Sequence, residues 1–86
     1  MAFTVYLLIQ TRHGKSRIVH SALSKFDEIR ELHEIYGRFD LIAKVEVEDQ
    51  EALQIFMQNK FRITEHIRYA ETLVAVNGDE EEAEEA

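Results

Sequence analysis

The chain contains no cysteine and no tryptophan, and none of its 86 residues belongs to an apolar run near the ~20 residues that a membrane helix needs. Without cysteine there is no disulfide framework, no thiolate metal site and no cysteine nucleophile. The N-terminus shows no basic segment followed by a small-residue cleavage site, so no secretory signal is expected. These absences favour a reducing, cytoplasmic setting without membrane contact.

Positive charge is also scarce, because 10 Lys and Arg stand against 17 Asp and Glu. Six of the 17 acids fall in residues 78–86, which hold no basic residue, so residues 1–77 carry 11 acids against 10 basic residues. A nearly neutral body lacks the basic stripe that neutralises phosphates, and we expect no direct DNA binding. We predict one domain over residues 1–77 and an acidic, disordered tail over residues 78–86.

Hydrophobic periodicity predicts four strands and two helices in the order β-α-β-β-α-β. In the first strand the residues between Phe3, Val5, Leu7 and Ile9 are also mostly apolar, so we expect the strand to be buried on both faces. Asp49 is a suitable N-cap for the second helix, and Gly37-Arg38 is expected to be a tight hairpin turn. The expected strands are residues 3–10, 29–36, 39–47 and 67–76, and the expected helices are residues 15–26 and 50–61 or 50–63.

This element order predicts an α+β, ferredoxin-like βαββαβ fold: a four-stranded antiparallel sheet with two helices on one face. The helices cover only one face, yet aliphatic and aromatic strand residues must lie on both. A bare apolar sheet face is an interaction surface. We therefore expect a homodimer that packs face to face through the other sheet face, which is the dimeric α+β barrel arrangement.

The polar residues do not assemble a catalytic or metal-binding motif. The four histidines lack the spacing of a zinc site, and Gly14-Lys15-Ser16 lacks the earlier glycine of a phosphate-binding loop, since Ile9 occupies that position. Asp40 follows the Gly37 turn on an apolar strand. Two interpretations of it stay open: a carboxylate held to accept hydrogen bonds from an ammonium group, or a turn residue that satisfies backbone donors of the hairpin. We expect no catalytic residue, metal or cofactor.

The order and spacing of several short motifs resemble the effector domain of the Lrp/AsnC transcriptional regulators, called the RAM domain. The most specific motif is the turn Gly37-Arg38-Phe39-Asp40. The others are the opening strand Val5-Tyr6-Leu7-Leu8-Ile9, Gly14-Lys15 before a helix, Glu34-Ile35-Tyr36, Glu48-Asp49, Asn59-Lys60-Phe61-Arg62-Ile63 and Glu71-Thr72-Leu73-Val74.

The resemblance implies an oligomerising regulatory module whose small-molecule effector is an amino acid bound in clefts between dimers. Carried over to this sequence, it implies Asp40 as the partner of the ligand's ammonium group, and Gly37 backbone with Arg38 for its carboxylate. Tyr36 and Phe39 would be apolar walls, and Thr72 a further polar contact. It also implies assembly of dimers into higher oligomers. Full-length regulators carry a helix-turn-helix domain, and this sequence is similar to stand-alone members, whose partners include such regulators.

Two alternatives remain. The chain is an interaction-only assembly partner of full-length regulators, which would show no response to a small molecule. Alternatively, it is a small dimeric α+β barrel enzyme, which would enclose a cavity between sheet and helices; the lack of tryptophan and the aliphatic residues beneath the helices count against this. The sequence does not identify the amino acid or the size of the oligomer.

Overall fold

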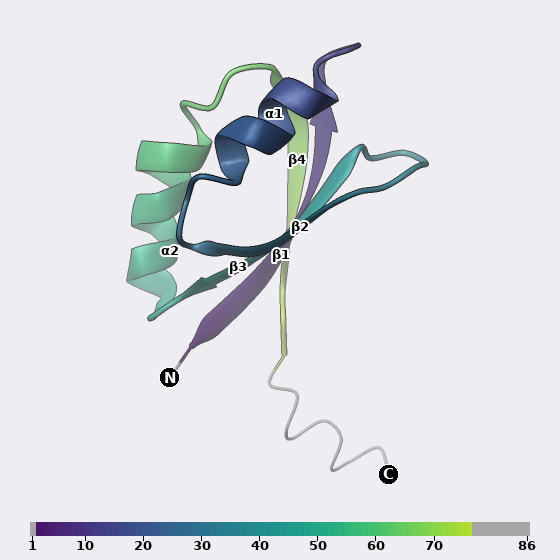
Figure 1. Ribbon diagram of the computed structural model, residues 1–86. Coiled ribbons are helices and arrows are strands. Elements are labelled where there is room, and N and C mark those ends of the chain that lie inside the picture. Colours follow the sequence, from purple (N-terminus) through teal and green to yellow (C-terminus); the bar gives the residue numbers. More distant parts are fainter. Residues whose placement is uncertain (1, 77–86) are drawn as a thin grey trace, which may run out of the picture.

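The computed structural model describes residues 2–76, which form one antiparallel sheet with both helices on the same side of it (Figure 1). The strand order β2-β3-β1-β4 confirms the predicted ferredoxin-like topology. The predicted tail, residues 78–86, and the domain boundary at residue 77 lie outside the described residues. The elements are β1 (Phe3–Thr11), α1 (Ser16–Leu23), β2 (Ile29–Glu34), β3 (Leu41–Val47), α2 (Gln50–Phe56), the π-helical η1 (Met57–Phe61) and β4 (Ile67–Val74).

The central strand β1 is buried on one face only, so the expectation of burial on both faces is wrong for the single chain. Val5, Leu7 and Ile9 are fully buried, whereas the residues between them are half-buried. The reason is that α1 and α2 cover one side of the sheet and nothing in the described chain covers the other. Strand β3 alternates in the same way and in register, with Leu7 opposite Ala43 and Leu8 opposite Ile42.

The core lies between the sheet and the helices. Phe56 of α2 is 1% exposed, and its ring meets Phe26 edge-to-face with centroids 5.9 Å apart. Such pairs stabilise beyond simple burial. The remaining buried apolar residues are Val5, Leu7, Ile9, Val19, Leu23, Leu41, Ala43, Val45 and Phe61. These aliphatic side chains pack between the sheet and the helices.

Several element ends differ from the prediction. The first helix stops at Leu23 instead of Phe26, since the Ser24 hydroxyl bonds to the Ser21 carbonyl and Phe26 turns into the core. The second helix covers the expected span, but its last turn is π-helical. The prediction of a tight turn at Gly37-Arg38 is wrong. Strand β2 ends at Glu34 and β3 begins at Leu41, so residues 35–40 form a longer loop. Strand β4 ends at Val74 instead of Val76.

The face of the sheet away from the helices, here called the open face, has an apolar part and a charged part. Register places its apolar residues together on β1, β3 and β4, namely Tyr6, Leu8, Ile42, Tyr69 and Leu73. Tyr69 is 53% and Leu73 46% exposed. The described residues thus leave an apolar patch at the position where the sequence analysis expected a second copy to pack.

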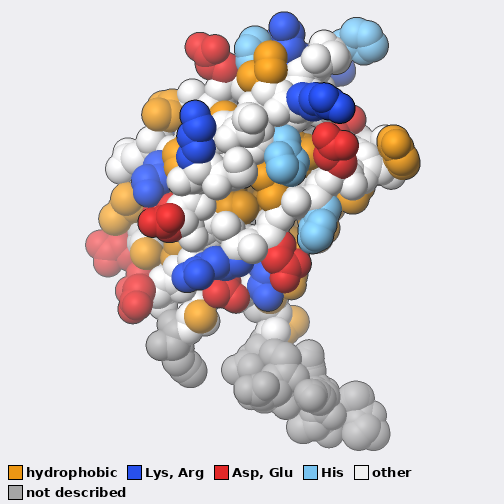
Figure 2. All heavy atoms as spheres, in the orientation of Figure 1, with side chains coloured by type: hydrophobic (Ala, Val, Ile, Leu, Met, Phe, Trp, Pro, Cys, Tyr) orange, Lys and Arg blue, Asp and Glu red, His pale blue; other side chains and the backbone are white. Residues whose placement is uncertain are grey.

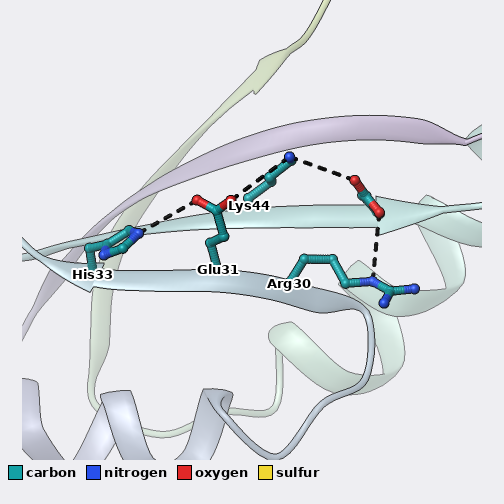
Figure 3. A network of polar contacts seen from close by, with 5 residues as sticks. Arg30, Glu31, His33 and Lys44 are labelled. Atoms are coloured by element: carbon teal, nitrogen blue, oxygen red, sulfur yellow. Dashed lines mark ion pairs between the residues drawn. The ribbon is translucent and has the colours of Figure 1, made fainter.

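The charged part of the open face is a chain of ion pairs across β2 and β3 (Figure 3). Lys44 lies 3.9 Å from Glu31 and 3.7 Å from Glu46. His33 continues the chain from Glu31, and Arg30 from Glu46, at 3.5 and 3.7 Å. Each pair is solvated and contributes little on its own. Their effect is to make this side of the open face hydrophilic.

Among residues 2–76, no helix is long and apolar enough to span a membrane.

Candidate functional site

Asp40 is fixed to the end of β1 by three hydrogen bonds. Its backbone N–H donates to the Ile9 carbonyl at 2.8 Å. Its carboxylate oxygen Oδ2 accepts from the Thr11 backbone N–H at 2.8 Å and from the Thr11 hydroxyl at 3.2 Å. Thr11 is only 8% exposed, so this carboxylate satisfies a buried donor. Within residues 2–76, the second oxygen, Oδ1, accepts no hydrogen bond.

The loop that contains Asp40 is closed by a hydrogen bond between its ends and contacts strands β1 and β4. The Ile35 N–H donates to the Asp40 carbonyl at 2.9 Å, and the Gln10 side-chain amide donates to the Arg38 carbonyl at 2.7 Å. Phe39 stacks on Tyr69 of β4, with ring centroids 6.4 Å apart, and the Arg38 guanidinium lies 5.4 Å from the Phe39 ring. These contacts give Arg38 and Asp40 defined positions, although both belong to a loop.

A pocket of about 320 Å³ lies beside Asp40. Four segments meet there: the end of β1, the loop to α1, the β2–β3 loop and the start of β4. The pocket is lined by Gln10, Thr11, Arg12, His13, Gly14, Ser16, Arg38, Asp40 and Arg68. Figure 1 places the β1–α1 loop at the upper end of the molecule, and Figure 2 shows Lys or Arg, His and Asp or Glu side chains at that end. The pocket therefore combines one carboxylate with several cationic groups.

Backbone irregularities bring two of the arginines to this pocket. Gln10 pairs with Tyr69, but the next β1 residue, Thr11, pairs with Ile67, so Arg68 is the extra residue of a bulge. Bulges re-aim side chains near functional sites. Arg12 is positioned by its own N–H, which donates to the His66 carbonyl at 2.9 Å. His66 takes a positive φ of 73°, a conformation that non-glycine residues adopt uncommonly.

The structure brings together only part of the residue set expected from the sequence. Arg38 and Asp40 line the pocket, and Phe39 packs just behind them on Tyr69. Gly37, with φ of 123°, and Tyr36, fully exposed, lie in the loop outside the pocket lining. Thr72 pairs with Leu7 near the middle of β1 and does not line the pocket. Ligand binding by Tyr36, Gly37 and Thr72 therefore stays a prediction, and it requires a cleft that is shared with another copy of the chain.

The sequence reasoning missed Thr11, Arg12 and Arg68. Thr11 and Arg12 follow directly on an apolar strand, which is a weak signal for a site at the strand end. Arg68 had no signal, because only the bulge brings it there. The charged groups suit a polar organic ligand better than a metal: within the described chain, no three His, Asp or Glu side chains cluster as metal ligands do.

Comparison with known proteins gives a consistent result. A family model described as the Lrp/AsnC ligand binding domain matches residues 4–81. The HTH-type transcriptional regulator FL11 of Pyrococcus abyssi is 35% identical over 52 residues, which are 60% of this chain. That match spans only 34% of the regulator's length.

Solved structures agree with this match. FFRP-DM1 is 34% identical with a TM-score of 0.82, over 86% of this chain and 99% of its own. A transcriptional regulator from Neisseria meningitidis, solved as a complex with L-Met, has a TM-score of 0.76 over 87% of this chain and 50% of its own. At 13% identity, that second likeness establishes the shared fold and no more.

Proposed function

The chain belongs to the Lrp/AsnC ligand binding domain family, and on that premise we propose that it is an amino-acid-binding, oligomerising regulatory module. The observation that carries the proposal is the pocket beside Asp40, where a carboxylate and guanidinium groups line the same space. An α-amino acid carries an ammonium and a carboxylate on one carbon atom. A site for it therefore needs a negative and a positive group close together.

In the proposed binding mode, the Asp40 carboxylate accepts a hydrogen bond from the ligand's ammonium group through Oδ1. Because Thr11 occupies Oδ2, the carboxylate is already oriented before the ligand arrives. The Arg38 guanidinium binds the α-carboxylate, as a planar fork of N–H donors suits two carboxylate oxygens. The L-Met complex of the Neisseria meningitidis regulator supports this ligand class for the family's fold.

We propose that the apolar part of the open face is covered by a second copy, and that dimers assemble further. Tyr6, Leu8 and Ile42 are half-buried within one chain and would become buried between two sheets. A ligand bound between dimers would shift the oligomer equilibrium only by as much as it prefers one assembly over the other. Regulation of transcription then follows from assembly, with full-length regulators of the family as further partners.

The proposal includes no catalysis and no DNA contact by this chain. The relatives from Pyrococcus abyssi and Neisseria meningitidis are transcriptional regulators, which agrees with a non-enzymatic role. Residues 1–77 are nearly neutral, so they offer little attraction to DNA phosphates. A cytoplasmic setting stays our prediction.

A second function, assembly without any small-molecule ligand, is favoured by one observation. The hydrogen bonds from Thr11 give Asp40 a structural role, although the donors belong to β1 and not to the hairpin that the turn-residue interpretation named. If that is its whole role, the chain acts only by binding its relatives.

Thermal unfolding in the presence of each of the twenty amino acids separates the two functions. A ligand at about 100 times its dissociation constant stabilises the folded state by roughly 2.7 kcal/mol, which gives a clear shift in Tm. A selective shift that disappears in Asp40→Asn supports the amino-acid-binding function. No shift with any amino acid at millimolar concentration contradicts it and favours the assembly-only function.

A further inference from the structure

The charges that line the Asp40 pocket do not balance. Arg12, Arg38 and Arg68 contribute three positive charges, and Asp40 contributes the one negative charge. A neutral amino acid brings one charge of each sign, so it leaves this excess unchanged. Within residues 2–76, none of the three arginines forms an ion pair, so the excess is not neutralised by this part of the chain.

The uncharged residues that line the pocket also favour a charged or polar ligand over an apolar one. Gln10, Thr11, His13 and Ser16 all offer polar side-chain atoms, and Gly14 offers backbone. Not one of the nine lining residues has a purely hydrocarbon side chain. A leucine, methionine or phenylalanine side chain would find no apolar surface there and would lose little water on binding.

The three guanidiniums also come from separate, anchored backbone positions. Arg38 lies in the β2–β3 loop over Phe39, Arg12 follows β1 and is tied to His66, and Arg68 is the bulged residue of β4. Separate origins allow two anionic groups of one ligand to be bound at once. One arginine then suffices for the α-carboxylate, which leaves two for a second anionic group.

We propose that the ligand of this pocket is an acidic α-amino acid, glutamate or aspartate, whose side-chain carboxylate is bound by Arg12 and Arg68. This inference rests on the amino-acid-binding function proposed above and adds the ligand's class. The neutral isosteres glutamine and asparagine lack the second charge, although their shapes are almost the same. A hydrogen bond to a charged group is stronger than one between neutral groups, so the acids bind about tenfold tighter or more.

The test is calorimetric titration of the full chain with L-glutamate, L-glutamine, L-aspartate, L-asparagine, L-leucine and glutarate. We expect L-glutamate or L-aspartate to bind about tenfold or more tighter than its amide. Arg12→Gln and Arg68→Gln should each reduce that preference, because each variant weakens binding of the acid more than binding of its amide. Arg62→Gln is the matched control, because Arg62 is equally exposed but does not line this pocket.

The other results separate the two proposals. Binding of glutamine, asparagine or leucine as tightly as the acids overturns the ligand class but leaves amino-acid binding intact. Binding of glutarate as tightly as L-glutamate overturns both, since the ammonium group is then not recognised by Asp40. The absence of binding by every amino acid overturns both as well. A preference for acids that survives in both arginine variants overturns the assignment of the side-chain carboxylate to Arg12 and Arg68.

Discussion

Thr11 donates two hydrogen bonds to the same carboxylate oxygen of Asp40, one from its backbone and one from its hydroxyl group. The two oxygens of the carboxylate therefore differ: Oδ2 is hydrogen-bonded within the fold, and we propose that Oδ1 binds the ligand. Oδ2 satisfies a buried backbone donor, while Oδ1 accepts no hydrogen bond within residues 2–76, and Asp40 lines a pocket together with three arginines. The structural and ligand-binding interpretations of Asp40 are therefore compatible, and mutations can separate them.

The first prediction concerns the two ways of removing this carboxylate. Asp40→Ala leaves the buried Thr11 N–H without a partner, so we expect a loss of about 1–3 kcal/mol in the free energy of unfolding. Asp40→Asn keeps an oxygen acceptor and removes only the charge, so its stability should stay within about 1 kcal/mol of the parent. Urea unfolding measures both. Amino-acid binding should be lost in both variants.

Thr11→Val is the matched control for Asp40, because it removes the hydroxyl donor but keeps the backbone N–H and the carboxylate. We expect it to lose about 0.5–1.5 kcal/mol of stability and to retain amino-acid binding. Equal loss of binding in Thr11→Val and Asp40→Asn would mean that the charge of Asp40 does not contact the ligand.

The second prediction concerns the ion pair between Glu28 and Lys60. Burial tends to raise the pKa of Glu28, but hydrogen bonds from Lys60, a backbone hydrogen bond and the Lys60 charge outweigh it and hold this pKa below its ordinary 4.5. The Lys60 ammonium lies 2.9 and 3.1 Å from the two carboxylate oxygens. A lowered folded-state pKa means that the pair stabilises the fold above the unfolded-state pKa, and that this contribution is lost as pH falls through the folded-state pKa.

Glu28→Gln should therefore cost about 0.5–1 kcal/mol near neutral pH, a small value because Lys60 is 44% exposed. The difference from the parent should shrink as the pH falls below the pKa of Glu28. Unfolding in urea at several pH values measures it, with Lys60→Gln completing a double-mutant cycle. A difference that is independent of pH would show that the charge of Glu28 does not stabilise the fold.

The third prediction concerns the apolar part of the open face. Leu8→Lys places an ammonium group opposite Glu71 in the β1–β4 register, so the single chain tolerates it. Burial of that ammonium between two sheets is unfavourable. We expect light scattering to show a shift from dimer to monomer, with an unchanged circular dichroism spectrum. Ile63→Lys is the control, because Ile63 is 70% exposed and follows η1 instead of lying on the sheet. A dimer that survives Leu8→Lys would place the interface elsewhere.

The fourth prediction concerns the core. Phe56→Ala removes a ring that is 1% exposed and loses the edge-to-face contact with Phe26. We expect a cost of about 3–5 kcal/mol, which is a large part of the stability of a domain this small. Ile55→Ala, at a neighbouring position that is 53% exposed, should cost much less. Thermal unfolding compares the two, and equal costs would contradict the packing described here.

The sequence predicted the fold well because the pattern of each strand was simple. Leu41, Ala43 and Val45 alternate with half-buried residues on β3, as expected. Asp49 caps α2 by accepting from the Ala52 N–H at 2.9 Å, which the N-cap preference also predicted. On β4, Tyr69 and Leu73 alternate with Ala70 and Thr72, and their register against β1 places the two pairs on opposite faces of the sheet.

The candidate site was less predictable because it depends on tertiary contacts. The Gly37 motif identified the loop with Arg38 and Asp40, but the length of that loop is set by contacts with Ile9 and Gln10 on another strand. Arg68 enters the pocket through a bulge, and no local pattern in the sequence encodes one. The burial of β1 was overestimated because an exposed apolar sheet face has the same composition as a buried one.

The strand order β2-β3-β1-β4 also leaves two strands with unpaired backbone groups along one side, and they differ in how they resist unwanted pairing. Strand β2 carries Arg30, Glu31, His33 and Glu34, and a bulge disrupts its ladder at Arg30, so another strand has difficulty adding to it. Strand β4 ends in the uncharged stretch Thr72-Leu73-Val74, which is exposed. We therefore expect any edge-to-edge aggregation of this protein to begin at the C-terminal half of β4, because the charges of β2 oppose strand addition at the other edge of the sheet.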